Sequence, residues 1–389
     1  MATIATSGNV SGEPRPAFGE AERLAAEELA GRLAEMGREA AIQPFWARPY
    51  WWASQAICAG IGVIASVVAI RSPLTGLLLA AGALFLSLAD ETRFQPLRRL
   101  TPSRGGQNVV SRPPADPPSG GVFLVLTASV DDSRPARSAG IARSLILANA
   151  IALALVAVCA GIRLGGFGGL LLDVAQLLPT LFLLAMILAL LDRGTASPEA
   201  DPSACDAVLE LTGRLDANPP VNLAVAVVFA GGGDAHAVGL RHWLATRRRR
   251  GMNPRETAII SVESCREGSP VWWKRDGTVV ATGLHPQLRA AATRAAGELP
   301  DLGARAVSGP DATAAGVARG GRWPALAIGT RANDGDRPEE GADEAGEGSA
   351  GPGSAVSDVV EFGEAIVREL DEELGNRDSD EQPAQSSSS

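Results

Sequence analysis

The hydrophobic residues of this chain fall into two patterns: long stretches without any charge, and short runs separated by amphipathic segments. The charge-free stretches approach the roughly 20 residues that a helix needs to cross hydrocarbon, which disfavours buried helices of a soluble core. They form two pairs, 53–70 with 73–89 and about 144–162 with 174–191. The pattern predicts four transmembrane helices arranged as two hairpins, at 53–89 and 144–191.

The remaining sequence alternates helical and strand patterns. Between Glu20 and Met36, apolar residues recur at steps of three and four, and Gly37 follows, which predicts an amphipathic helix. Further helices are expected at 204–215, 235–247, 286–297 and 356–374, and strands at 108–110, 122–127, 223–230, 257–263 and 325–329. Continuous apolar strands that alternate with helices favour a sheet covered on both faces. The predicted fold class is α/β: a mixed sheet flanked by helices and interrupted by two membrane hairpins.

The soluble domain is therefore expected in several pieces. They are 18–46, 106–133 and 201–330, with a C-terminal helix at 355–375 that packs back on the domain. Residues 1–17, the acidic Gly/Pro/Glu linker 331–354 and the polar tail 376–389 lack apolar periodicity and are expected to be disordered.

Arginine is unevenly distributed around the hairpins. Nine arginines flank the long connections, whereas Arg71 and Arg163 lie in the short turns. By the positive-inside rule, the soluble domain and both termini of this multi-pass protein of the cell membrane face the cytoplasm. The first residues lack the basic and apolar segments of a signal peptide. Asp173, at the mouth of the fourth span, is expected to be an interfacial turn residue rather than a functional acid in the bilayer.

Composition adds few constraints. The chain has 389 residues, 46% of them hydrophobic, and a formal net charge of −9, with much of the acid after Arg331. The folded part is nearer neutral, so we expect no nucleic-acid partner. The expected partners are the lipid bilayer and an unidentified protein or peptide. The four cysteines show no CxxC spacing and are expected to be buried thiols in a reducing compartment.

Six segments occur in an order that carries a family resemblance. They are GEAERLAAEELAGRLAEMG followed by AAIQPF, NVV with VFLVLTASVDDS, CDAVLELTGRL, VAVVFAGGGDAHAVGLRHWLA, AIISVES and SGPDATAAGVARGGRWPALAIG. From about residue 18 to 330 and over the last helix, excluding the two membrane hairpins, the chain resembles the di-zinc aminopeptidase-type exopeptidases. This group includes bacterial leucyl aminopeptidases and the glutamate carboxypeptidase and transferrin-receptor ectodomains. An active member needs two zinc ions, a bridging carboxylate and a Glu that deprotonates the bridging water.

Three positions that the resemblance assigns to this chemistry are lost. The histidine of the family's HxD motif falls on Ser129, which is a poor zinc ligand, although its acid is kept as Asp131. The general base falls on Gly233, which has no side chain to accept a proton. The family's last ligand is a His close to the final helix, and no histidine follows His285. We therefore expect no catalytic residue.

The acids of the resemblance are partly retained. The bridging acid falls on Ala200, or on Asp201 if the alignment shifts by one residue, and the other metal acids fall on Asp234 and Glu263. With Asp131 they would form an all-oxygen set, which suits magnesium or calcium better than zinc. We expect them to be polar residues left at strand ends and expect no cofactor; zinc would be required if the chain were active.

Other polar motifs do not restore a site. His236 and His242 are six residues apart on an expected helix and point to different faces, and His285 precedes a proline at an expected helix start. The glycines 231–233 lack the GK[ST] or GxGxxG context of a phosphate loop and are expected to form a turn. The run Arg247–Arg250 is expected to be a solvated helix end, with binding to acidic lipid headgroups as the alternative.

These losses favour a membrane-anchored, cytoplasm-facing pseudo-exopeptidase that binds or scaffolds a partner. One alternative is an active metal-dependent aminopeptidase with rearranged ligands. Another is a purely structural membrane protein, whose cleft would be filled with side chains. The sequence leaves the first and the last of these open.

Overall fold

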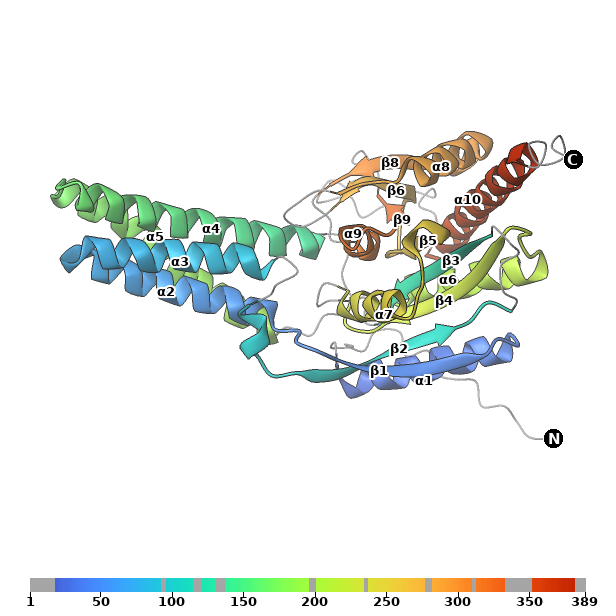
Figure 1. Ribbon diagram of the computed structural model, residues 1–389, viewed down its shortest axis with the longest axis horizontal. Helices are drawn as coiled ribbons and strands as arrows, with labels where there is room; N and C mark the ends of the chain where they lie inside the picture. Colours follow the sequence, from blue (N-terminus) through green and yellow to red (C-terminus); the bar gives the residue numbers. More distant parts are fainter. Residues whose placement is uncertain are drawn as a thin grey trace, which may run out of the picture. The chain divides into compact units, whose positions relative to one another are not determined.

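The structure is a computed structural model, and its described residues are 18–91, 96–114, 121–130, 137–195, 201–233, 237–276, 282–309, 313–332 and 352–381. The chain divides into two compact units (Figure 1). The first, here the sheet unit, comprises 1–45, 105–136 and 198–389. The second, here the helical unit, comprises 46–104 and 137–197.

The sheet unit is built on a mixed sheet, as the sequence predicts. The strand order is β1-β2-β4-β3-β5-β9-β6-β7, with β8 paired to β6. The central strands β4, β3, β5 and β9 are parallel, whereas β2 runs antiparallel to β4 and β6 antiparallel to β9. The strands are β1 (Ala40–Ala47), β2 (Arg104–Ser111), β3 (Val122–Ser129), β4 (Leu223–Ala230), β5 (Thr257–Val262), β6 (Ser269–Asp276), β7 (Thr282–Gly283), β8 (Arg305–Ser308) and β9 (Ala325–Arg331).

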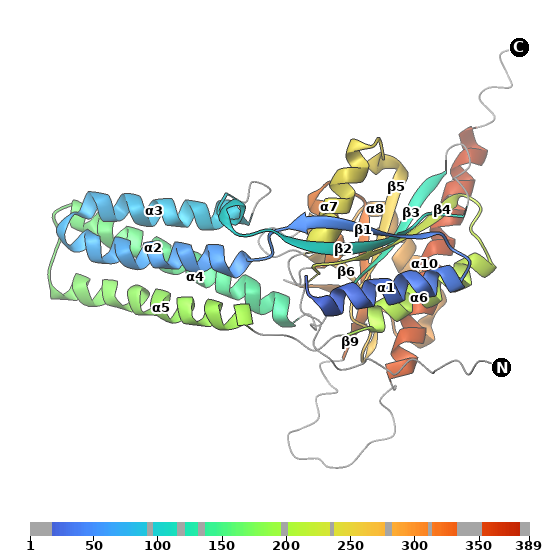
Figure 2. The same cartoon turned by 90° about the horizontal axis from the view of Figure 1, so that it is seen from below.

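Helices cover both faces of this sheet. The larger core packs α1 (Glu20–Glu35), α6 (Ser203–Ala217), α8 (Pro286–Glu298) and α10 (Pro352–Glu381) on one face. The other face carries α7 (Val238–Arg249) and α9 (Ala314–Gly320). Figure 2 shows α1 and α6 side by side, where Arg32 pairs with Asp206 at 2.6 Å. Because both faces are covered, a central strand such as β3 is apolar on both sides: Leu124 and Val125 are fully buried.

The helical unit contains the four expected spans. They are α2 (Trp51–Arg71), α3 (Pro73–Asp90), α4 (Arg137–Leu164) and α5 (Leu170–Thr195), all long and apolar enough to cross a membrane. Alanines such as Ala65 and Ala80 are fully buried between helices, as small residues permit close approach. Large apolar side chains point outward instead, and Ile64, Phe85 and Leu188 are more than half exposed. Such a surface is unfavourable in water and suited to lipid.

Several boundaries differ from those expected. Helix α4 begins at Arg137, before the span expected from about 144, and the apolar span within it is Ser144–Leu164, as expected. Helix α5 runs from Leu170 to Thr195, and its apolar span, Leu170–Asp192, is slightly longer than the expected 174–191. Helix α7 begins at Val238 instead of 235, because Ala237 has a left-handed φ of 48° that a helix interior does not adopt. Helix α10 continues through Gly375 to Glu381, so the tail predicted to be disordered from 376 is helical at its start. Residues 1–17 and most of the linker 331–354 lie outside the described residues.

Candidate functional site

The expected site lies at the carboxyl ends of the parallel strands. Ser129 ends β3 and pairs in register with Ala230 at the end of β4. The Ser129 hydroxyl donates a hydrogen bond of 3.4 Å to the Ala230 carbonyl. Glu263 directly follows β5, and Asp201 precedes α6. The structure thus brings three of the positions named by the resemblance to the same edge of the sheet.

Asp201 is held by groups of the protein itself. Nε of Arg266 lies 3.0 Å from Oδ2 of Asp201, whose side chain is only 4% exposed. The Ser264 hydroxyl donates to the same oxygen, and the Ser203 N–H donates to Oδ1 at 3.1 Å. The negative charge of Asp201 is therefore balanced by the guanidinium of Arg266, as a bound metal ion would balance it.

Glu263 is also engaged inside the fold. Its Oε1 accepts a hydrogen bond of 2.7 Å from the Ser261 hydroxyl and one of 3.1 Å from the Ala314 N–H. The Ser261 hydroxyl in turn accepts from the Ala315 N–H at 3.2 Å. The N–H groups of Ala314 and Ala315 are the first two of α9, and the first N–H groups of a helix have no acceptor within that helix. The carboxylate of Glu263 therefore caps α9 from the end of β5.

The glycine turn after β4 is packed against a buried carboxylate. Glu22 of α1 is 1% exposed and accepts from the backbone N–H groups of Phe18 at 2.6 Å and Gln107 at 3.2 Å. A Cβ on Gly231 would lie 2.5 Å from Oε1 of Glu22, so only glycine fits there. Burial raises the pKa of Glu22, while backbone donors, including the Gly232 N–H, act in the opposite direction.

A buried asparagine closes the same turn from β2. The Asn108 side chain accepts from the Gly231 N–H at 3.1 Å and donates to the Gly239 carbonyl at 3.0 Å. The amides of Gly231 and Gly232 thus donate to side chains of the protein. This supports the prediction that the glycines form a turn and do not cradle a phosphate.

The other predicted residues add no ligand set. Asp131, Asp234, Ala200 and His236 lie outside the described residues. Among those described, no group of three or more His, Cys, Asp or Glu side chains is arranged to hold a metal ion. His242 stacks on Phe45 with ring centroids 5.6 Å apart, and His285 is the N-cap residue of α8. Asp201 and Glu263, as bonded in this structure, do not fit the open ligand positions that a di-zinc centre needs.

Sequence reasoning missed most of the partners at this edge. Glu22 and Ser264 lie within segments of the resemblance that assign them no role, and Arg266 lies outside those segments. The roles of all three depend on contacts with residues distant in the chain. All four cysteines are free and buried, which confirms the prediction of buried thiols. Two of them lie at this edge: Cys205 Sγ donates to the Ser129 carbonyl at 3.2 Å, and Cys265 Sγ to the Glu263 carbonyl at 3.1 Å.

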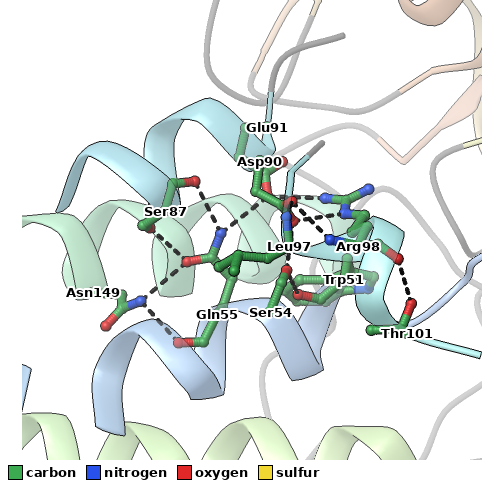
Figure 3. A network of polar contacts seen from close by, with 10 residues as sticks. All are labelled: Trp51, Ser54, Gln55, Ser87, Asp90, Glu91, Leu97, Arg98, Thr101 and Asn149. Carbon is green, nitrogen blue, oxygen red and sulfur yellow. Dashed lines mark hydrogen bonds and ion pairs between the residues drawn. The ribbon is translucent and has the colours of Figure 1, made fainter. Parts of the chain in front are cut away.

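The helical unit contains a second polar cluster, which the sequence did not predict (Figure 3). Its centre is Asp90 at the end of α3, fully buried and 3.1 Å from Nε of Arg98 in the 3₁₀ helix η1 (Arg98–Leu100). Asp90 also accepts from the N–H groups of Leu97 and Arg98, both at 3.0 Å, and from the Ser54 hydroxyl at 2.6 Å. This carboxylate therefore ties η1 to α2 and α3.

Gln55 extends the cluster to a third helix. Its Oε1 accepts from the Ser87 hydroxyl at 2.7 Å and from Asn149 Nδ2 at 3.0 Å. Its Nε2 donates to Glu91 at 3.1 Å, and Glu91 also pairs with Arg98 at 3.0 Å. Figure 3 shows these side chains converging from α2, α3 and α4. We call the residues Ser54, Gln55, Ser87, Asp90, Glu91, Arg98 and Asn149 the Asp90 cluster.

A further polar group joins α2, α4 and α5. Gln176 donates to the Ser66 hydroxyl at 2.9 Å and accepts from Arg163 at 2.9 Å, and Thr180 is 2.6 Å from the Ser66 hydroxyl. Arg163 also pairs with Asp173, whose side chain is 53% exposed. Asp173 is therefore an exposed ion-pair partner near the turn, consistent with the prediction made for it.

Comparisons with known proteins concern the fold. No family profile matches the chain, and no curated protein matches it. Similar solved structures include a leucine aminopeptidase precursor from Bacteroides thetaiotaomicron (11% identity, 91% of each chain covered, TM-score 0.46). A zinc aminopeptidase from Bacillus subtilis is similar at 8% identity over 92% of this chain and 91% of that one, with a TM-score of 0.44. Porphyromonas gingivalis glutaminyl cyclase, a kind of protein that the sequence resemblance did not include, is similar at 11% identity over 92% and 93%, with a TM-score of 0.43.

Proposed function

We propose that this protein is a membrane-anchored, peptidase-like binding or scaffolding protein that has lost hydrolysis. The observation that carries the proposal is the ion pair of Arg266 with Asp201, at 3.0 Å. A resident guanidinium neutralises the carboxylate nearest to the family's bridging position. Gly233 supplies no general base, and Glu263 is committed to capping α9.

The sheet unit is proposed to act by binding, because it keeps the strand edge of an exopeptidase-like domain without its reactive groups. Its partner is proposed to be a protein or peptide. The four spans anchor the chain in the bilayer, and we propose that the sheet unit and both termini face the cytoplasm, on the basis of the arginine asymmetry.

The test is the metal content and activity of the full chain purified in detergent. We expect less than one zinc ion per chain by elemental mass spectrometry and no turnover of a panel of aminoacyl substrates. Asp201→Asn and Glu263→Gln should leave both readouts unchanged. Two zinc ions per chain, with turnover that a chelator abolishes and that these variants reduce, would instead establish an active aminopeptidase with rearranged ligands.

A further inference from the structure

Two adjoining hollows lie at the amino-terminal edge of the parallel strands, opposite to the edge of Ser129 and Glu263. The first encloses about 860 Å³, including space open to solvent, and is lined by residues that include Arg255, Arg319, Arg322, His285 and Trp323. The second, about 470 Å³ on the same measure, is largely apolar, with Val122, Leu223, Ala258, Leu288 and Leu374 in its wall. We call them the basic hollow and the apolar recess. Arg255, His285, Gln287 and Pro324 line both, so the two are continuous.

The basic hollow carries positive charge that the described residues do not compensate. Arg319 is neutralised, because its guanidinium pairs with the fully buried Asp276. Arg255 and Arg322 have no acidic partner within the part of the chain that the structure describes. Two acids are near. Glu256 accepts from Asn253 at 2.6 Å. Glu373 lines the apolar recess, where its charge is neutralised by Arg294 at 3.0 Å and it accepts from Gln287 at 3.5 Å.

Helix α8 adds to this positive field. It begins at Pro286, with His285 as its N-cap, and both His285 and Gln287 line the hollows. The aligned peptide dipoles of a helix place partial positive charge at its N-terminus, which favours a nearby anion. The helix is 13 residues long, so its first turn is supported by further regular turns.

Arg322 occupies a backbone position that does not suit arginine. It has φ of +64° and directly follows Gly321, the C-cap of α9. Glycine is preferred at this left-handed position after a helix, because a Cβ makes the conformation costly. The strain places a guanidinium at the basic hollow, and residues in such conformations are concentrated at functional sites.

We propose that these hollows bind a small phosphate monoester whose ester group is a short apolar chain. Guanidinium groups pair with the oxygens of phosphate through charge-assisted, bidentate hydrogen bonds. A phosphate monoester carries a charge of about −1.5 to −2 at neutral pH, which matches two uncompensated arginines better than a single carboxylate does. The apolar recess next to Arg255 accepts the hydrocarbon part. This site is separate from the edge considered under the proposed function and does not depend on it.

The experiment is calorimetric titration of the full chain in detergent with butyl phosphate, inorganic phosphate and butyrate. We expect butyl phosphate to bind most tightly of the three. Arg255→Gln should weaken it by roughly tenfold, the effect of losing a charge-assisted contact. Ala258→Leu, which fills the recess, should reduce its affinity to that of inorganic phosphate. Arg289→Gln, at an exposed position of α8 that lines neither hollow, should change nothing.

Arg322→Gly separates binding from folding. Because glycine relieves the left-handed strain, this variant should melt at a higher temperature than the native chain while it loses butyl phosphate binding. No binding of butyl phosphate at millimolar concentration, or equal losses in Arg289→Gln and Arg255→Gln, would overturn the proposal. A second comparison uses hydrogen exchange of the first turn of α8. If nanodiscs that contain phosphatidic acid slow this exchange and butyl phosphate does not, the proposal is also overturned, because the ligand would then be a lipid headgroup.

Discussion

Glu22 lies in the first turn of α1, where an acidic side chain normally faces water. In this protein its carboxyl group is 1% exposed and packs under the turn that follows β4. Burial raises its pKa above the ordinary value of 4.5. The folded state therefore holds this proton more tightly than the unfolded chain does. Folding takes up a proton between pH 4.5 and the raised pKa, so the free energy of unfolding falls as pH rises through that window.

Replacing Glu22 tests this linkage. In Glu22→Gln, the melting temperature should decrease less steeply above pH 4.5, because the glutamine side chain has no acidic proton to lose. Each unit by which folding raises the pKa of Glu22 corresponds to about 1.4 kcal/mol in the free energy of unfolding. The measurement is thermal unfolding of the detergent-purified chain over a series of pH values. Glu28→Gln, at an exposed position of the same helix, should keep the native slope. Parallel curves for all three proteins would show that Glu22 does not titrate in this range.

At the scale of single residues, the location of a side chain in the fold was easier to predict from the sequence than the groups that it contacts. Ser129, Asp201 and Glu263 lie at one sheet edge because parallel strands end together, which the order of strands and helices makes predictable. The ion pair of Arg266 with Asp201 joins residues far apart in the chain, and no local pattern encodes it. The ion pair that decides whether Asp201 can bind a metal could therefore not be predicted from the sequence alone.

At the scale of elements, the helical unit uses polar side chains to fix how its apolar helices meet. Lipid tails are as apolar as leucine, so hydrophobicity alone does not orient helices against each other in a bilayer. The Asp90 cluster connects α2, α3, η1 and α4 through hydrogen bonds with defined geometry. Asp90 itself is fully buried, and removing one member of a buried ion pair leaves the other charge uncompensated.

The two ion pairs of the helical unit therefore predict unequal effects. Asp90→Asn should lower the free energy of unfolding by about 3–5 kcal/mol, the usual cost of breaking a buried pair. Asp173→Asn removes the exposed partner of Arg163 and should cost about 0–1 kcal/mol. Both values can be measured by titration with sodium dodecyl sulfate in mixed micelles. Equal and small losses would mean that water reaches Asp90 in the folded protein.

The elements themselves were predictable to different degrees. The four spans are evident because helices of soluble domains rarely run to such lengths without a charged residue. Strand β6 was missed, since its apolar part is limited to Val271, Trp272 and Trp273 and the exposed Lys274 and Arg275 follow. The pairing of β6 with β8 and β9 supplies its stability, and this is a tertiary effect that a local pattern does not show.

At the scale of the whole molecule, the chain inserts two helical hairpins into the connections of an α/β domain. Both hairpins leave and re-enter the sheet unit, so the sheet unit is completed only after the second hairpin has been synthesised. We predict that all pieces of the sheet unit lie on one side of the membrane, because a hairpin of two spans returns the chain to the side from which it departed. This topology makes one orientation measurement sufficient for all the soluble segments.

We predict that this side is the cytoplasm, because arginine is concentrated in the long connections and sparse in the short turns. Gly168→Cys lies in the turn between α4 and α5, where a Cβ meets no atom within 4 Å, and Arg250→Cys lies at the exposed end of α7. In sealed right-side-out vesicles, a membrane-impermeant maleimide should label Gly168→Cys at once and Arg250→Cys only after the vesicles are opened. The native chain, whose four cysteines are buried, gives the background. Labelling of Arg250→Cys in sealed vesicles would reverse the predicted orientation and would place the sheet unit and any partner outside the cell.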